Sequence, residues 1–134
     1  MHRIPNHEGN CRAYHGHRYV AEFTCSAPRL DALGRIVDFS VLKSVLGGWI
    51  DEHFDHTAIF ARSDRDPAAL AVARSNAEVG KPVYMMDCPP TAENIAEELS
   101  QIATRLLQPY GIAVRRITVW ETPNCYATWT AEAR

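Results

Sequence analysis

Residues 91–108 read TAENIAEELSQIATRLLQ, and this stretch decides the fold class of the chain. Its apolar residues recur at spacings of four, three and four, which places them on one face of a helix. They are Ile95, Leu99, Ile102 and Leu106. Thr91 is the expected N-cap, and Glu93 lies favourably against the positive end of the helix dipole. A helix with one apolar face needs a surface to cover, so the neighbouring segments are expected to supply a sheet.

Extended segments lie on both sides of this helix in the sequence. Residues 112–121 and 125–130 are expected to form two strands joined by a tight turn. Nearer the start, apolar residues alternate with polar ones over 15–27, which is typical of a half-buried strand. A turn signal at Leu33-Gly34 then suggests that residues 35–39 complete a hairpin with that strand.

Further helices are expected between the two hairpins. Ser40 is a plausible N-cap for a helix over residues 42–50. Asp66-Pro67 is a good start for a shorter helix over 68–79, and residues 83–86 are expected to be extended. The whole pattern predicts an α+β fold, in which helices cover one face of an antiparallel four-stranded sheet.

Composition restricts the class of protein. The chain has 134 residues, of which 46% are apolar and 22% charged, so we expect a single globular domain over residues 1–134. A formal net charge of −2 provides no strongly basic face for nucleic acid. No apolar run approaches the ~18 residues of a membrane helix, no secretory signal is visible, and four Cys do not suggest a disulfide framework. We therefore expect a cytoplasmic protein that binds neither nucleic acid nor membranes.

The sequence His15-Gly16-His17 indicates a metal site. Residues i and i+2 of a strand point to the same face, so both imidazoles are expected to project together. Catalytic zinc usually takes three protein ligands and leaves one position open. His2, His7 and Cys11 are the nearest candidates for the third ligand, and an HxH pair alone is equally compatible with two ordinary exposed histidines.

Three other features have the chemistry of an active site. Cys11, four residues before His15, would be stabilised as a thiolate beside a metal, which suits proton transfer. In Asp55-His56 a carboxylate could orient the imidazole, although such a dipeptide is also common at a solvated helix end. Glu121 ends an apolar row of a strand and could accept two hydrogen bonds from a guanidine-like edge, or be an ordinary strand-end acid.

Together these segments resemble the 6-pyruvoyl-tetrahydropterin synthase / 6-carboxytetrahydropterin synthase family, from His2 to about Trp129. The matching motifs are CRAYHGH (11–17), VDFSVLK (37–43), FDH (54–56), PTAEN (90–94) and WET (120–122). The spacing from Cys11 to His15 fits the Cys-x3-His-Gly-His pattern of the queuosine-pathway branch. The resemblance therefore implies conversion of 7,8-dihydroneopterin triphosphate into 6-carboxytetrahydropterin, with release of acetaldehyde and triphosphate.

The resemblance also implies a role for each matching residue. The zinc ligands would be His2, His15 and His17. The catalytic residues would be Cys11, Asp55 and His56. The substrate-binding residues would be Glu121, which anchors the pterin ring, Thr91, which lines its pocket, and Glu93, which supports it. The triphosphate needs cations, and the arginines near the metal ligands in sequence cannot be assigned from the sequence: Arg3, Arg12 and Arg18.

The family fold implies a homohexamer, a dimer of trimers whose active sites lie at subunit interfaces. Family members normally have a full strand before the first zinc ligand, so His2 at the second position predicts a truncated first strand. If Met1 is the true start, this ligand is expected on a flexible terminus. The extra helix within 57–88 is expected on the outside. The alternatives are a pyruvoyl-type synthase, a non-catalytic metal- or pterin-binding domain and, with least support, a zinc hydrolase.

Overall fold

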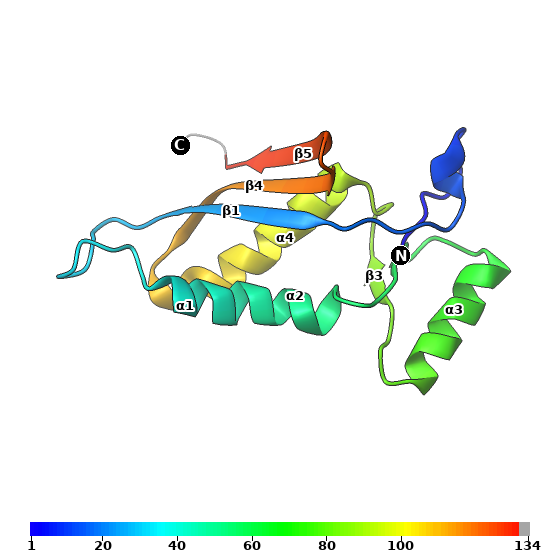
Figure 1. Ribbon diagram of the computed structural model, residues 1–134, viewed down its shortest axis with the longest axis horizontal. Helices are drawn as coiled ribbons and strands as arrows, with labels where there is room; N and C mark the ends of the chain where they lie inside the picture. Colours follow the sequence, from blue (N-terminus) through cyan, green and yellow to red (C-terminus); the bar gives the residue numbers. More distant parts are fainter. Residues whose placement is uncertain (132–134) are drawn as a thin grey trace.

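The main sheet contains three antiparallel strands in the order β1–β4–β5 (Figure 1). In the computed structural model, which describes residues 1–131, these strands are β1 (Val20–Ser26), β4 (Ala113–Thr122) and β5 (Cys125–Thr130). Within this described part of the chain, β1 and β5 each pair only with β4, so each has one free edge. The predicted C-terminal hairpin is confirmed, and the α+β class with it.

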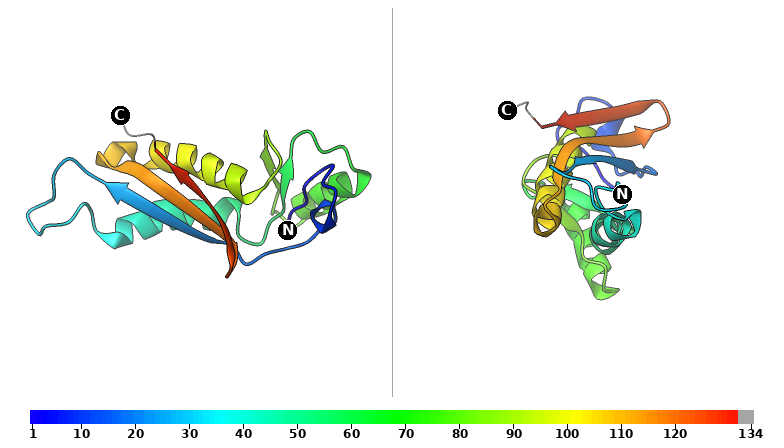
Figure 2. Two further views of the ribbon diagram at one scale, coloured as in Figure 1. Left: turned by 90° about the horizontal axis from the view of Figure 1, so that it is seen from above. Right: turned by 90° about the vertical axis from the view of Figure 1, so that its left-hand side faces the viewer.

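Helix α4 (Ala92–Leu107) packs on β4 and β5. The Thr91 hydroxyl caps it by accepting a hydrogen bond from the backbone N–H of Asn94 at 3.3 Å, as the sequence predicted. Ile95 and Leu99 are almost fully buried, and they pack in one core with Ile117 of β4. Figure 2 shows the helices on one side of the sheet, so the predicted layer arrangement is confirmed.

The other long helical segment runs from Phe39 to His53. It consists of α1 (Phe39–Leu42), a π-helical turn η2 (Lys43–Gly47) and α2 (Gly48–His53). The N-cap is Asp38, whose carboxylate accepts from the backbone N–H of Ser40 at 2.9 Å. The prediction of Ser40 as the cap was therefore wrong by two residues.

The predicted N-terminal hairpin is also wrong, since residues 35–38 contain no strand. The Asp31 carboxylate accepts backbone N–H bonds from Leu33 and Arg35, both at 2.9 Å, and Arg35 in turn donates to Asp38. These bonds hold the segment as a loop that leads into the helix. For this reason β1 pairs with β4 alone, and the described sheet has three strands where the sequence suggested four.

A second, parallel pair of strands lies at the other end of the molecule. It joins β2 (Ile59–Ala61) to β3 (Tyr84–Met86), and α3 (Pro67–Glu78) connects them on the outside (Figure 1). Asp66 caps α3 as predicted, whereas β2, only three residues long, was not predicted. Ala69 of α3 packs beneath this unit in a small apolar cluster of its own with Phe60.

The first residues of the chain lie between β2 and the segment that precedes β1. The backbones of His2 and His15 exchange two hydrogen bonds, at 2.8 and 3.1 Å, and the N–H of Ile59 donates to the Met1 carbonyl at 2.8 Å. The His2 side chain is 1% exposed. The expectation that His2 is carried on a flexible terminus is therefore wrong. Within residues 1–131 we find no helix with the length and apolar character needed to cross a membrane.

Candidate metal centre and active site

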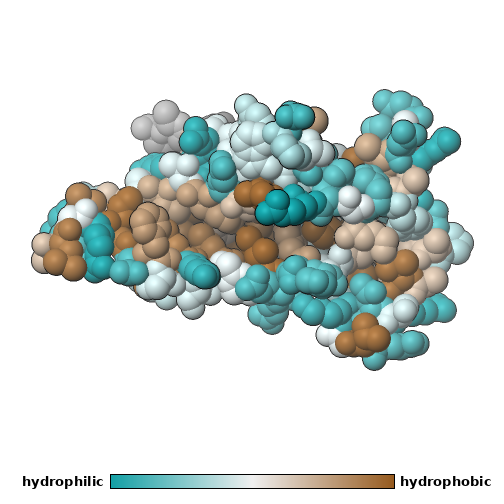
Figure 3. Space-filling model, in the orientation of Figure 1, coloured by the Kyte–Doolittle hydropathy of each residue, from teal (hydrophilic) through white to brown (hydrophobic). Residues whose placement is uncertain are grey.

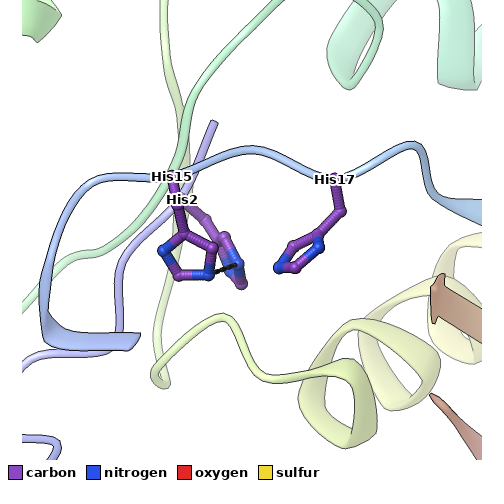
Figure 4. A group of neighbouring side chains, drawn as sticks. All are labelled: His2, His15 and His17. Atoms are coloured by element: carbon purple, nitrogen blue, oxygen red, sulfur yellow. Dashed lines mark hydrogen bonds between the residues drawn. The ribbon is translucent and has the colours of Figure 1, made fainter. Parts of the chain in front are cut away.

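Three histidine side chains, His2, His15 and His17, point toward one another at the N-terminal end of β1 (Figure 4). Their ligand nitrogens all lie within 4.8 Å of one another. His15 and His17 are brought together as the HxH spacing predicted, although both precede the strand itself. The third member of the cluster is His2, rather than His7 or Cys11.

Backbone carbonyls fix the orientation of two of these rings. His2 Nδ1 lies 2.9 Å from the carbonyl oxygen of Pro90, and His15 Nδ1 lies 2.8 Å from that of Ala13. A carbonyl only accepts hydrogen bonds, so each Nδ1 carries the proton and each Nε2 presents a lone pair. Burial, the largest effect, lowers the pKa of His2 and favours its neutral form. Metal-binding histidines are typically oriented in this way.

The resulting donor set fits a metal ion. The Nε2 atoms of His2 and His15 face each other at 3.0 Å. Two lone pairs at that distance repel unless a cation or a proton lies between them. Nitrogens bound at about 2.0–2.1 Å to tetrahedral zinc lie roughly 3.3 Å apart, which is close to the observed spacing. His17 would supply a third nitrogen, so the cluster suits a metal that keeps one position open.

Glu121 lies directly beside this cluster. Its Oε1 is 3.8 Å from His2 Nε2 and 3.7 Å from His17 Nε2. The Tyr19 hydroxyl donates a hydrogen bond to the same oxygen at 3.2 Å. Burial, followed by the charge of Glu121, raises the pKa of Tyr19, so its phenol stays protonated and continues to donate. The carboxylate is thus held in one orientation within 4 Å of two potential ligands.

Two cavities share His17 and Arg18 in their linings. One, of about 470 Å³, is lined by Asp55 and His56 and by apolar residues of α4 and β4. The other, of about 580 Å³, is lined by Glu121 and Trp120. Both volumes fall in the range of small-molecule sites, about 300–1,000 Å³.

Asp55 and His56 form the pair that the sequence suggested. The Asp55 carboxylate lies 2.7 Å from His56 Nδ1, which allows it to orient the imidazole. The φ angle of His56 is +55°, a conformation that non-glycine residues rarely adopt. The side chains of His56 and Asp55 are 84% and 54% exposed, so the imidazole is available to a molecule in the cavity or to another subunit.

The other expected site residues do not line either cavity. Cys11 lies half-buried in a short 3-10 helix, near enough to Tyr19 to contribute to the raised pKa of its phenol. The Thr91 hydroxyl is used to cap α4. Glu93 is exposed in the first turn of that helix. Within one chain, none of these three residues therefore lines the cavities beside the histidine cluster, and the roles expected for them stay predictions.

Sequence reasoning missed Tyr19 as a site residue. It follows His15 and His17 at the same spacing of two, which is the signal that could have identified it. The structure also separates the candidate arginines, since Arg3 is bound to Asp64 and Asp66 while Arg18 lines both cavities.

Comparison with known sequences assigns the family. Residues 1–132 match the sequence model described as 6-pyruvoyl tetrahydropterin synthase. The chain belongs to this family. Its relatives include 6-carboxy-5,6,7,8-tetrahydropterin synthase from Rickettsia bellii, 40% identical over 126 residues that cover 93% of this chain and 88% of the relative. A probable enzyme of the same name from Halobacterium salinarum is 32% identical over 91% of this chain and 74% of its own length.

Solved structures of similar proteins agree with this family fold. An uncharacterised protein from Wolinella succinogenes superposes with a TM-score of 0.80 at 22% identity, over 98% of this chain and 92% of its own. The 6-pyruvoyl tetrahydropterin synthase of Plasmodium vivax superposes with a TM-score of 0.68 at 17% identity, over 98% of this chain and 89% of its own. At these identities the likeness supports the fold alone.

Proposed function

We propose that the chain is a zinc-dependent 6-carboxy-5,6,7,8-tetrahydropterin synthase that acts on 7,8-dihydroneopterin triphosphate. The observation that carries the proposal is the cluster of His2, His15 and His17 with Glu121 beside it. It lies in a chain that is 40% identical to a relative of that name. The products, formed from the substrate and one water molecule, would be 6-carboxytetrahydropterin, acetaldehyde and triphosphate, within queuosine or other 7-deazapurine biosynthesis.

Glu121 is proposed to bind the pterin ring. The amino-pyrimidinone edge of a pterin offers two adjacent N–H donors, which one carboxylate can accept together. Glu121 Oε1 lies 3.8 Å from His2 Nε2 and 3.7 Å from His17 Nε2. A pterin ring bound by Glu121 would therefore place the side chain of the substrate near the histidine cluster. Thr91 and Glu93, which line neither cavity within one chain, are proposed to complete the pterin pocket where subunits meet. Pro90, the first residue of their motif, already contacts His2 through its carbonyl.

The proposed ligands His2, His15 and His17 would hold zinc, which supplies a Lewis acid that acidifies the vicinal hydroxyls of the substrate. Cys11 and His56 would then move protons between carbon and oxygen, and Asp55 would keep the imidazole oriented through its 2.7 Å contact. As the electrons are redistributed within the substrate, the reaction needs no redox cofactor. These steps would make the enzyme a lyase.

The assembly is proposed to be a homohexamer, a dimer of trimers with active sites between subunits. Asp55 and His56 are exposed, as residues shared with a neighbour would be. The free edges of β1 and β5, in the described part of the chain, can be closed by joining sheets into a barrel. An apolar band also lies open beside β1 (Figure 3). Native mass spectrometry should detect six chains, and a monomer at micromolar concentration would contradict the proposal.

Product analysis tests the proposed reaction. We expect the zinc-loaded protein, given 7,8-dihydroneopterin triphosphate, to release one acetaldehyde for each 6-carboxytetrahydropterin formed. A product that retains the three-carbon side chain would identify a pyruvoyl-type synthase instead. Zinc and pterin binding with no turnover would identify the non-catalytic alternative.

A further inference from the structure

Arg3 is the residue that follows the metal-ligand candidate His2, and its guanidinium is bound by two carboxylates. Its Nε and Nη2 contact both oxygens of Asp64, at 2.7 and 3.2 Å, and its Nη1 contacts Asp66 at 2.7 Å. The Asp64 side chain is only 2% exposed, and that of Arg3 is 16% exposed. Such planar, two-point pairing fixes a direction as well as a distance. Arg3 is therefore held firmly and is not free to bind phosphate.

The two carboxylates are themselves fixed by the backbone. Asp64 belongs to a turn just after β2, in which its N–H donates to the Ala61 carbonyl at 2.9 Å. Its carboxylate also accepts from the N–H of Asp66 at 3.0 Å. Asp66 uses its second oxygen to cap α3 through the N–H of Ala68. The acceptors of Arg3 therefore belong to the rigid start of the β2–α3 unit.

Tyr14 connects the same group to the second ligand candidate. Its ring packs against the Arg3 guanidinium, with 5.3 Å between the Arg3 Cζ and the ring centroid. Tyr14 precedes His15, and its ring also meets Phe60 of β2 edge-on. The backbones of His2 and His15 are hydrogen-bonded to each other. The residue that follows His2, Arg3, therefore contacts the residue that precedes His15, Tyr14.

We propose that Arg3 is a positioning residue for the metal centre: clamped by Asp64 and Asp66, it holds His2 and His15 in the arrangement that binds metal. The proposal rests on the metal site proposed above, and it gives the β2–α3 unit a function. That unit supplies the buried anchor for the N-terminal ligand, which otherwise depends on a few backbone bonds and the ring contact with Pro90.

The test compares variants with the wild type by two readouts. One is zinc affinity, measured by competition with a chromogenic chelator, and the other is the visible spectrum of the Co²⁺-saturated protein. Arg3→Lys keeps the positive charge but loses the planar guanidinium that pairs with both oxygens of Asp64, and Asp64→Asn removes the negative charge of the acceptor. We expect each to weaken zinc binding about 10–100-fold and to shift the Co²⁺ bands. The double variant should lose no more than the worse single one, because both changes break the same contact. Arg62→Lys, which alters the exposed pair with Asp87, should leave both readouts unchanged.

Circular dichroism of the metal-free proteins separates positioning from folding. Folded Arg3→Lys and Asp64→Asn proteins with wild-type affinity and spectrum would overturn the proposal. A structural role alone would lower the Tm yet leave the spectrum of the metal-saturated protein unchanged, which would also overturn it. If neither variant folds, Tyr14→Leu, which removes only the packed ring, decides by the same two readouts. A wild-type chain that binds no zinc would instead refute the metal site itself, and this proposal with it.

Discussion

The histidine cluster depends on which nitrogen of each ring is free. Because backbone carbonyls accept the Nδ1–H groups of His2 and His15, both Nε2 lone pairs are directed at the same space. The sequence predicted that His15 and His17 lie together, because side chains two residues apart in an extended segment point to the same side. It could not choose His2 over His7 by spacing, since that choice depends on a backbone pairing between distant segments. The roles proposed for Cys11, Thr91 and Glu93 stay predictions.

At Cys11 the proposed role is proton transfer rather than metal binding. Cys11→Ala should therefore retain zinc and bind the pterin substrate while turnover falls by roughly two to four orders of magnitude, the range typical of a lost acid–base group. Cys125→Ala, at an exposed cysteine, is the matched control and should remain active. Acetaldehyde release and zinc content measure both properties, and undiminished turnover in Cys11→Ala would exclude the thiol from the reaction.

Glu121 is expected to act mainly in substrate binding. In Glu121→Gln the accepting carboxylate becomes an amide that is partly a donor, so it no longer matches two N–H groups. We expect KM to rise at least 10-fold, because a hydrogen bond to a charged group contributes about 1.5–3 kcal/mol. Glu52→Gln changes an exposed carboxylate and serves as the control. Steady-state kinetics showing an unchanged KM would argue against ring anchoring by Glu121.

At the level of elements, the sequence predicted the segments whose signals are local. Helix α4 has a cap and a periodic apolar face, and the β4–β5 hairpin has a tight turn. Local signals gave a wrong result at two places. The short strand β2 exists because it pairs with β3, which lies far along the chain. The expected strand at 35–39 fails because Asp31 and Asp38 bind nearby backbone N–H groups and favour a loop and a helix start.

Two glycines provide a test of the helical segments. Gly48 begins α2 with φ of −58°, and an added Cβ would meet nothing within 4 Å. Gly48→Ala should therefore raise the free energy of unfolding by about 0.5–1 kcal/mol. Gly80, just after α3, has φ of +76°. Gly80→Ala should lower the free energy of unfolding by about 1–2 kcal/mol, since a Cβ strains this left-handed conformation. Urea unfolding measures both changes in free energy, and changes of the same sign and size would contradict the φ angles of the two glycines.

At the scale of the whole molecule, the proposed metal centre joins parts of the chain that are distant in sequence. His2 lies against His15 and Ile59 through its backbone and against Pro90 through its ring. The α+β class and the expected arrangement of helices on one face were predictable, because amphipathic periodicity reports which face is buried. The hexamer and the cytoplasmic location stay predictions, since they depend on partners and surroundings that local patterns do not encode.

Metal binding should consequently stabilise the whole fold. A ligand that binds only the native state at 100 times its Kd adds about 2.7 kcal/mol to the free energy of unfolding. Zinc at that concentration should raise the Tm of the metal-free wild type, and chelation should reverse the change. The Tm of His15→Ala should respond little to zinc. A zinc response that persists in this variant would place the stabilising site elsewhere.

The most direct test of the metal centre is anomalous diffraction from crystals of the zinc-loaded protein, measured on both sides of the zinc absorption edge. We predict one strong anomalous peak per chain, within bonding distance of nitrogens of His2, His15 and His17. The absence of a peak at these three side chains, or a peak bound only by other residues, would contradict the account.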